Sequence, residues 1–70
     1  MREWLRAKRR SEKLTQAKIA GAMGISQRYY CDIEAGIKKE LSLRQAVQLS
    51  VILGVSMEQI IAEEEKLKEE

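Results

Sequence analysis

The 70-residue sequence predicts an all-α fold. Its apolar residues recur at helical spacing rather than in the alternation typical of strands. The chain contains no proline that would interrupt a helix. Serine or threonine precedes most apolar stretches and glycine follows several of them, which are the usual places for helix caps. These signals predict five helices in one compact domain, since a chain of this length can form only one.

The first helix is expected to span about residues 2–13. Leu5 and the aliphatic stem of Arg9 fall on its inner face. Trp4, the only tryptophan, is expected to cover the core against the C-terminal helix. The outer face carries the cations Arg6, Arg10 and Lys13.

Residues 14–36 predict two short helices joined by a tight turn. Thr15 is a good N-cap for the first, and Gly24 can take the positive φ that ends it. The second helix begins after its N-cap, Ser26, and stops before Gly36. This segment is therefore predicted to be a helix-turn-helix.

A helical wheel divides the helix after Ser26 into two faces. Its inner face is mostly apolar and holds Tyr30, Ile33, Glu34 and Ile37. Its outer face is polar or small and holds Gln27, Arg28, Cys31, Asp32 and Ala35. The inner face of the preceding helix holds Ile19, Ala20 and Met23.

Two capping boxes predict the remaining helices, because Ser42 precedes Gln45, and Ser56 precedes Gln59, by three positions. The fourth helix should span 43–53, and the fifth should start at 57. The wheel places on the inner stripe of the fourth helix Leu43, Ala46, Val47, Ser50 and Leu53. The Ser50 hydroxyl is expected to bond the carbonyl four residues back.

The net charge of +2 is unevenly distributed. Residues 1–41 contain ten basic and five acidic side chains, whereas residues 42–70 contain three basic and six acidic ones. A molecule with this polarity would turn its first half toward a polyanion. The charge count alone is equally compatible with charges that only solvate helix surfaces.

The residue types argue against several classes of function. Histidine is absent and Cys31 is the only cysteine, so neither a zinc cluster nor a Cys-His nucleophilic pair can form. The chain also has no phosphate-cradling glycine loop. We therefore expect no enzymatic activity, no metal and no cofactor.

Three features of the sequence bear on the cellular location of the protein. Charges occupy the opening MREWLRAKRR where a signal peptide has an apolar stretch, and no apolar run reaches the length of a membrane span. A single thiol suits a reducing compartment. The sequence therefore predicts a cytoplasmic protein without membrane contact, with a domain at 1–62 and an acidic helical tail at 63–70.

Several short motifs suggest a family. The chain contains, in order, LRAKR, LTQ, IA, MGIS, IEAG and LGVS. Together they resemble the lambda repressor and Cro-like helix-turn-helix family of bacterial and phage regulators, also called the xenobiotic response element family, over about Leu5 to Ile61. The chain departs from the family pattern at Leu41, where proline is common, and at Ile37, where a basic residue is common.

The resemblance implies a sequence-specific DNA-binding transcriptional regulator, most often a repressor. Its third helix would lie in the major groove of double-stranded DNA, and a homodimer would read a two-fold symmetric operator. The alternative is a protein-interaction module, such as an antitoxin, whose main partner is another protein.

Three residues on the outer face of the third helix are candidates for base contacts. Gln27 and Arg28 stand at its N-terminal end, where glutamine can pair with adenine and arginine with guanine. Asp32 could accept a hydrogen bond from cytosine, or could instead orient Arg28 from position i+4.

Five residues are candidates for phosphate contacts. Gln16 and Ser26 stand at helix N-termini, where a side chain and backbone N–H groups can meet phosphate together. Tyr29 flanks the same surface, although it could equally pack against the second helix. On the family pattern, Lys38 and Lys39 add contacts from the loop that follows.

Two further groups have other expected roles. Arg9 and Glu34 match family positions that pair across helices, and both fall on inward faces, which predicts a structural ion pair. On the wheel Ile52 points away from the core stripe, so exposed apolar residues suggest a dimer interface. Its candidates are Val51, Ile52, Ile61 and Leu67.

Overall fold

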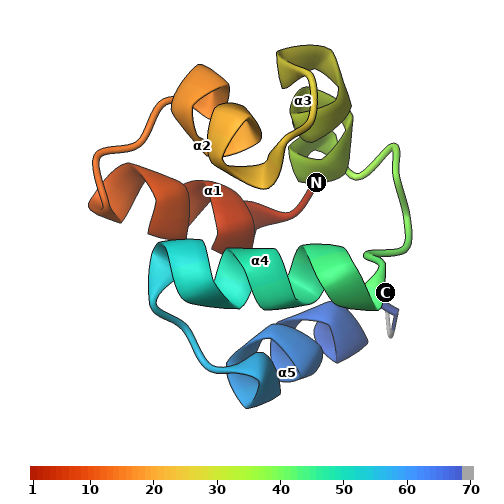
Figure 1. The fold of residues 1–70 in the computed structure, drawn as a ribbon. Coiled ribbons are helices and arrows are strands. Elements are labelled where there is room, and N and C mark those ends of the chain that lie inside the picture. Colours follow the sequence, from red (N-terminus) through yellow and green to blue (C-terminus); the bar gives the residue numbers. More distant parts are fainter. Residues whose placement is uncertain (69–70) are drawn as a thin grey trace.

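Five helices make up the part of the chain that the computed structural model describes, residues 1–68. They are α1 (Glu3–Ser11), α2 (Gln16–Met23), α3 (Gln27–Ala35), α4 (Leu43–Leu53) and α5 (Met57–Lys68). In Figure 1 the first three helices lie above α4 and α5 lies below it, and α1 also contacts α5 directly, through Trp4 and Glu64. The predicted all-α fold is therefore confirmed.

Local hydrogen bonds fix the starts of the helices where the sequence predicts them. The side chains of Thr15, Ser26 and Ser42 each accept a bond from the backbone N–H three residues later, at 3.0 to 3.1 Å. Ser42 and Gln45 form the complete capping box. At the other end of α2, Gly24 adopts a φ of 73°, which reverses the chain into α3 and makes the helix-turn-helix.

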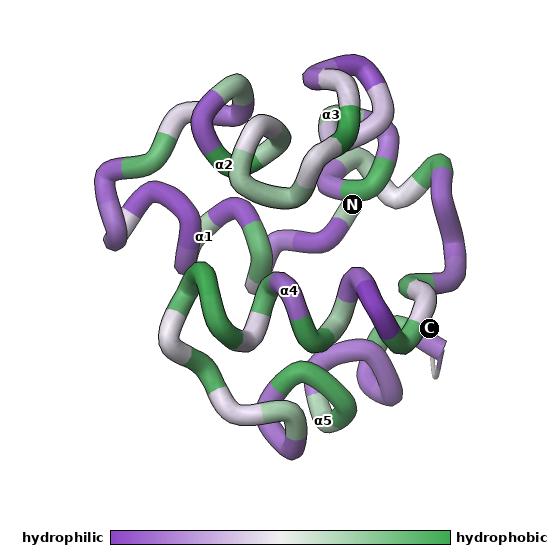
Figure 2. Tube along the Cα trace, viewed as in Figure 1, coloured by the Kyte–Doolittle hydropathy of each residue, from purple (hydrophilic) through white to green (hydrophobic). Residues whose placement is uncertain are grey.

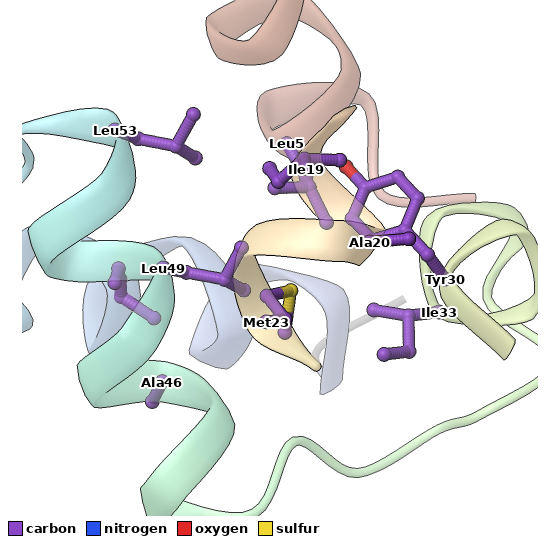
Figure 3. Close-up of a cluster of buried hydrophobic side chains, with 10 residues drawn as sticks. Leu5, Ile19, Ala20, Met23, Tyr30, Ile33, Ala46, Leu49 and Leu53 are labelled. Atoms are coloured by element: carbon purple, nitrogen blue, oxygen red, sulfur yellow. The ribbon is translucent and has the colours of Figure 1, made fainter. Parts of the chain in front are cut away.

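The core lies where α1, α2, α3 and α4 meet, with one contribution from α5. Most of α1 and the second half of α5 consist of hydrophilic residues (Figure 2). These two helices therefore contribute only a few apolar side chains to the core. Leu5, Ile19 and Tyr30 gather on one side of α2, and Leu49 and Leu53 approach from α4 (Figure 3). The remaining buried apolar residues are Ala20, Met23, Ile33, Ala46 and Ile60.

The predicted orientation of α4 is wrong in part. Leu43 is 76% exposed and Val47 is also exposed, whereas Leu49 is fully buried. Ile52, expected to point outward, packs against the core. Because α4 is apolar on most sides and contacts both α2 and α5, the sequence alone does not decide which of its faces is buried.

Three smaller predictions are corrected. Ile37 is exposed rather than inward, because α3 ends at Ala35 and the left-handed Gly36 turns the chain away. The Ser50 hydroxyl donates to the carbonyl of Val55, not to the carbonyl four residues back. The first helix begins one residue later and ends two residues earlier than predicted, and Arg2 before it is buried.

The proposed division at residue 62 falls inside the continuous helix α5. The tail proposed for 63–70 includes Glu64, which contacts residues near the N-terminus, and its last two residues lie outside the described part of the chain. Within residues 1–68, none of the helices has the length and apolar character that crossing a membrane requires.

Candidate nucleic-acid interface

The N-terminal end of α3 is an exposed polar surface. Gln27 and Arg28 are both exposed, and 88% of the Arg28 side chain is accessible. The Arg28 Nε lies 3.7 Å from the Asp32 carboxylate, one helical turn away. Because Arg28 is exposed and the pair is long, the pair contributes little to stability, and the guanidinium can reorganise when another molecule binds.

The opposite face of α3 is anchored by a buried ion pair. Arg9 donates from Nε and Nη2 to the two carboxylate oxygens of Glu34 at 2.9 and 3.0 Å. Its Nη1 donates to the carbonyl of Leu14 at 2.8 Å. The structure thus brings together the two residues expected to pair. Since they come from α1 and α3, the pair fixes how α3 sits on the domain.

The environment of this pair shifts three pKa values. The hydrogen bond with Glu34 raises the pKa of Arg9. Burial acts to raise the pKa of Glu34, but the hydrogen bonds from Arg9 and the nearby Tyr30 hydroxyl outweigh it, and the net pKa lies below the usual value. Burial, and next the nearby Glu34, raise the pKa of Tyr30. All three shifts favour a charged Arg9 and Glu34 beside a neutral Tyr30.

Gln16 lies at the first turn of α2 beside this pair. Its Nε2 is 3.5 Å from a carboxylate oxygen of Glu34, and the residue is half-buried. The amide is therefore oriented by Glu34 while it borders the surface that α2 and α3 share.

Tyr29 connects α3 to the start of α4. Its hydroxyl accepts a hydrogen bond from Gln45 Nε2 at 3.2 Å, and the Lys38 ammonium lies 4.9 Å from its ring centroid. The exposed side chains of Lys38 and Lys39 place two cations in the loop beside it.

Sequence reasoning missed one buried residue next to this loop. Arg2 is 1% exposed and pairs with Glu64, with Nη2 3.0 Å from Oε1. Trp4 Nε1 donates to the same carboxylate at 2.9 Å. Trp4 thus does contact the C-terminal helix. No motif in the sequence marks Arg2, which resembles the other cations of the first ten residues.

The candidate dimer residues do not share one environment. Val51 is 77% exposed and Ile61 is 54% exposed, whereas Leu67 is half-buried and Ile52 packs against the core. Val51 instead continues an exposed apolar row on α4, which begins with Leu43 and Val47 at four-residue spacing.

Comparison with known protein families matches residues 5–60 to a family described as helix-turn-helix. Searches of curated proteins and of solved structures give no match. The matched segment runs from α1 into α5 and contains the whole helix-turn-helix. The chain belongs to the lambda repressor and Cro-like helix-turn-helix family of DNA-binding regulators.

Proposed function

We propose that this protein is a sequence-specific transcriptional repressor that inserts α3 into the major groove of a two-fold symmetric operator. The observation that carries the proposal is the exposed polar end of α3, which stands on an opposite face fixed by the Arg9–Glu34 pair. A recognition helix needs this combination, because its outward side chains must be free to meet bases while its axis stays fixed.

The base contacts come from Gln27, Arg28 and Asp32. Gln27 suits adenine and Arg28 suits guanine, each bidentate pair contributing about 1 to 3 kcal/mol of discrimination. Asp32 already lies near Arg28, which favours its role as the residue that orients the guanidinium. A contact of Asp32 with cytosine is its second role.

The phosphate contacts surround this end of α3. The oxygens of Ser26 and Tyr29 each accept an intramolecular hydrogen bond, so their own hydroxyl protons can be donated to phosphate. Gln16 borders the same surface, and Lys38 and Lys39 supply positive charge. These contacts position the domain without reading sequence.

The protein acts as a homodimer whose two recognition helices are about 34 Å apart, one turn of DNA. Val51 and Ile61 are the preferred interface residues because both are exposed. Leu67 and Ile52 are the remaining candidates, and their side chains are less exposed. A bound dimer represses by excluding polymerase from the operator.

Selection of bound sequences from random DNA, followed by affinity measurements across a salt series, tests this function. We expect a palindromic site and a steep decrease of log K with log salt, about 0.9 for each phosphate contacted. Binding that is weak and indifferent to sequence would contradict the proposal.

A second function, as a protein-interaction module of the antitoxin type, is favoured by the exposed row of Leu43, Val47 and Val51. An exposed apolar surface on so small a domain suits a protein partner. A Gln27→Ala/Arg28→Ala variant would keep such a partner in a pull-down but lose operator binding, so the two functions can be separated.

A further inference from the structure

Arg2 is the most highly connected side chain in the described part of the protein. Its Nη1 donates to the carbonyls of Ile33 and Lys38, both at 2.6 Å, and its Nη2 donates to the carbonyl of Lys39 at 2.8 Å. Its Nε and Nη2 also face the carboxylate of Glu64 at 3.0 to 3.1 Å. Guanidinium has five N–H donors, and acceptors surround all of its nitrogens.

The backbone is arranged to bring Arg2 to this place. Its N–H donates to the carbonyl of Glu34 at 2.8 Å. A Cβ on Gly36 would come within 3.0 Å of the backbone nitrogen of Met1. Glycine at position 36 therefore allows the N-terminal segment to cross the end of α3, in addition to taking a positive φ of 86°.

The loop between α3 and α4 depends on this guanidinium. The N–H groups of Ile37 and Lys38 donate to the carbonyl of Asp32 at 3.0 and 3.2 Å, which closes the end of α3. Further along, Arg2 binds the carbonyls of Lys38 and Lys39. Within residues 1–68, no backbone-to-backbone hydrogen bond is made by the N–H of Lys39, Glu40 or Leu41. The guanidinium is thus the main polar anchor of the loop.

Glu64 in turn holds the guanidinium. Arg2 and Glu64 have side chains only 2% and 17% exposed, so an unpaired charge at either position would be costly. Trp4 fixes the same carboxylate from α1. Both Arg2 and Glu64 lie outside the family-matched segment, residues 5–60, so the family match says nothing of their pairing.

We propose that Glu64, acting through Arg2, positions Lys38 and Lys39 for contact with DNA phosphates. The inference rests on the proposed function, since it assigns these lysines to the phosphate surface. Glu64 is then a positioning residue for DNA binding. It has this role although Glu64 lies on the last helix and is negatively charged, as DNA is.

The test compares Glu64→Ala with Glu65→Ala, which removes the same charge from the adjacent exposed position. Loss of a negative charge by itself slightly strengthens DNA binding, and Glu65→Ala measures that effect. Relative to this control, we expect Glu64→Ala to lower the salt slope by about 1.8 and the affinity by up to about 30-fold at about 0.15 M salt, as for two lost phosphate contacts. Circular dichroism checks that both variants are helical.

A Lys38→Ala/Lys39→Ala background separates positioning from general destabilisation. In that background Glu64→Ala should have the same affinity and salt slope as Glu65→Ala, because the groups that Glu64 positions are gone. An equal loss of affinity in both backgrounds would overturn the proposal. If Glu64→Ala does not fold, Glu64→Gln against Glu65→Gln provides the same comparison.

Hydrogen exchange in the free protein provides a readout without DNA. Glu64→Ala should speed exchange of the Ile37 and Lys38 amides relative to Glu65→Ala, and unchanged exchange would overturn the anchoring of the loop. If the unmodified protein binds no specific DNA, the proposed function fails. If it binds and the two variants bind alike, only the positioning role of Glu64 fails.

Discussion

The two buried arginines, Arg9 and Arg2, stabilise different parts of the fold. Arg9 joins α1 to α3 through a glutamate 25 positions away, and it gives one further bond to a carbonyl. Arg2 reaches a glutamate 62 positions away and gives three bonds to carbonyls. The first fixes the angle of a helix, and the second fixes the path of a loop. Burial of a charge therefore has no single structural meaning, and its partners decide what it organises.

The strongest test of this difference is Arg9→Ala. The variant leaves Glu34 buried without its partner, so we expect a loss of about 3 to 5 kcal/mol in the free energy of unfolding. Chemical denaturation measures it, with the exposed neighbour variant Arg10→Ala as control. An unchanged melting temperature together with a sharp drop in operator affinity would instead move Arg9 to the phosphate contacts.

Acid should remove the contribution of the Arg9–Glu34 pair to the stability of the fold. The pKa of Glu34 is lower in the folded protein than its ordinary value of 4.5. The unfolded chain therefore binds this proton more tightly, so its contribution to stability is complete above that value and is lost as pH falls through the folded-state pKa. Denaturation between about pH 7 and pH 3 measures the slope. A Glu34→Gln variant with the same acid slope would rule out this glutamate as the cause.

Arg28 provides an exposed arginine for comparison. Arg28→Ala should lower operator affinity by about 1 to 3 kcal/mol, roughly 5- to 150-fold, and should relax the base preference at one position. Its free energy of unfolding should change by less than about 0.5 kcal/mol. Lys66→Ala, which removes the same charge from α5, is the matched control for binding. Equal effects of the two variants would show that Arg28 contributes only general attraction.

The smallest effect concerns the turn that presents the Leu14 carbonyl to Arg9. Lys13 precedes it with a positive φ of 58°, which L-residues other than glycine rarely adopt. Lys13→Gly should raise the free energy of unfolding by up to about 1 kcal/mol. The contrasting control is Ala7→Gly on the exposed side of α1, which should lower it by about 1 kcal/mol. Destabilisation by Lys13→Gly would mean that the lysine side chain supports the turn.

Features that depend on near neighbours could be predicted from the sequence. The caps at Thr15, Ser26 and Ser42 need only residues three positions away, and Gly24 needs only its own backbone freedom. The orientation of α4 could not be predicted, because it depends on how α2 and α5 pack against an apolar helix.

The candidate site divides in the same way. The exposed end of α3 follows from one helical wheel, and the Arg9–Glu34 pair follows from family positions. The Arg2–Glu64 pair could not be foreseen, since its two residues lie near opposite ends of the chain and outside the recognised motifs. Only the folded arrangement of α1, α3 and α5 brings them together.

The span of the Arg2–Glu64 pair also bears on the order of folding. Closing a segment of 62 residues instead of 25 costs about 0.8 kcal/mol more in chain entropy. We therefore expect contacts among the first three helices to form early and the contact between the two ends to form after the transition state. An interaction formed this late slows unfolding without speeding folding. The pair of Arg2 and Glu64 would then set how long the domain stays folded, and the pair of Arg9 and Glu34 how quickly it forms.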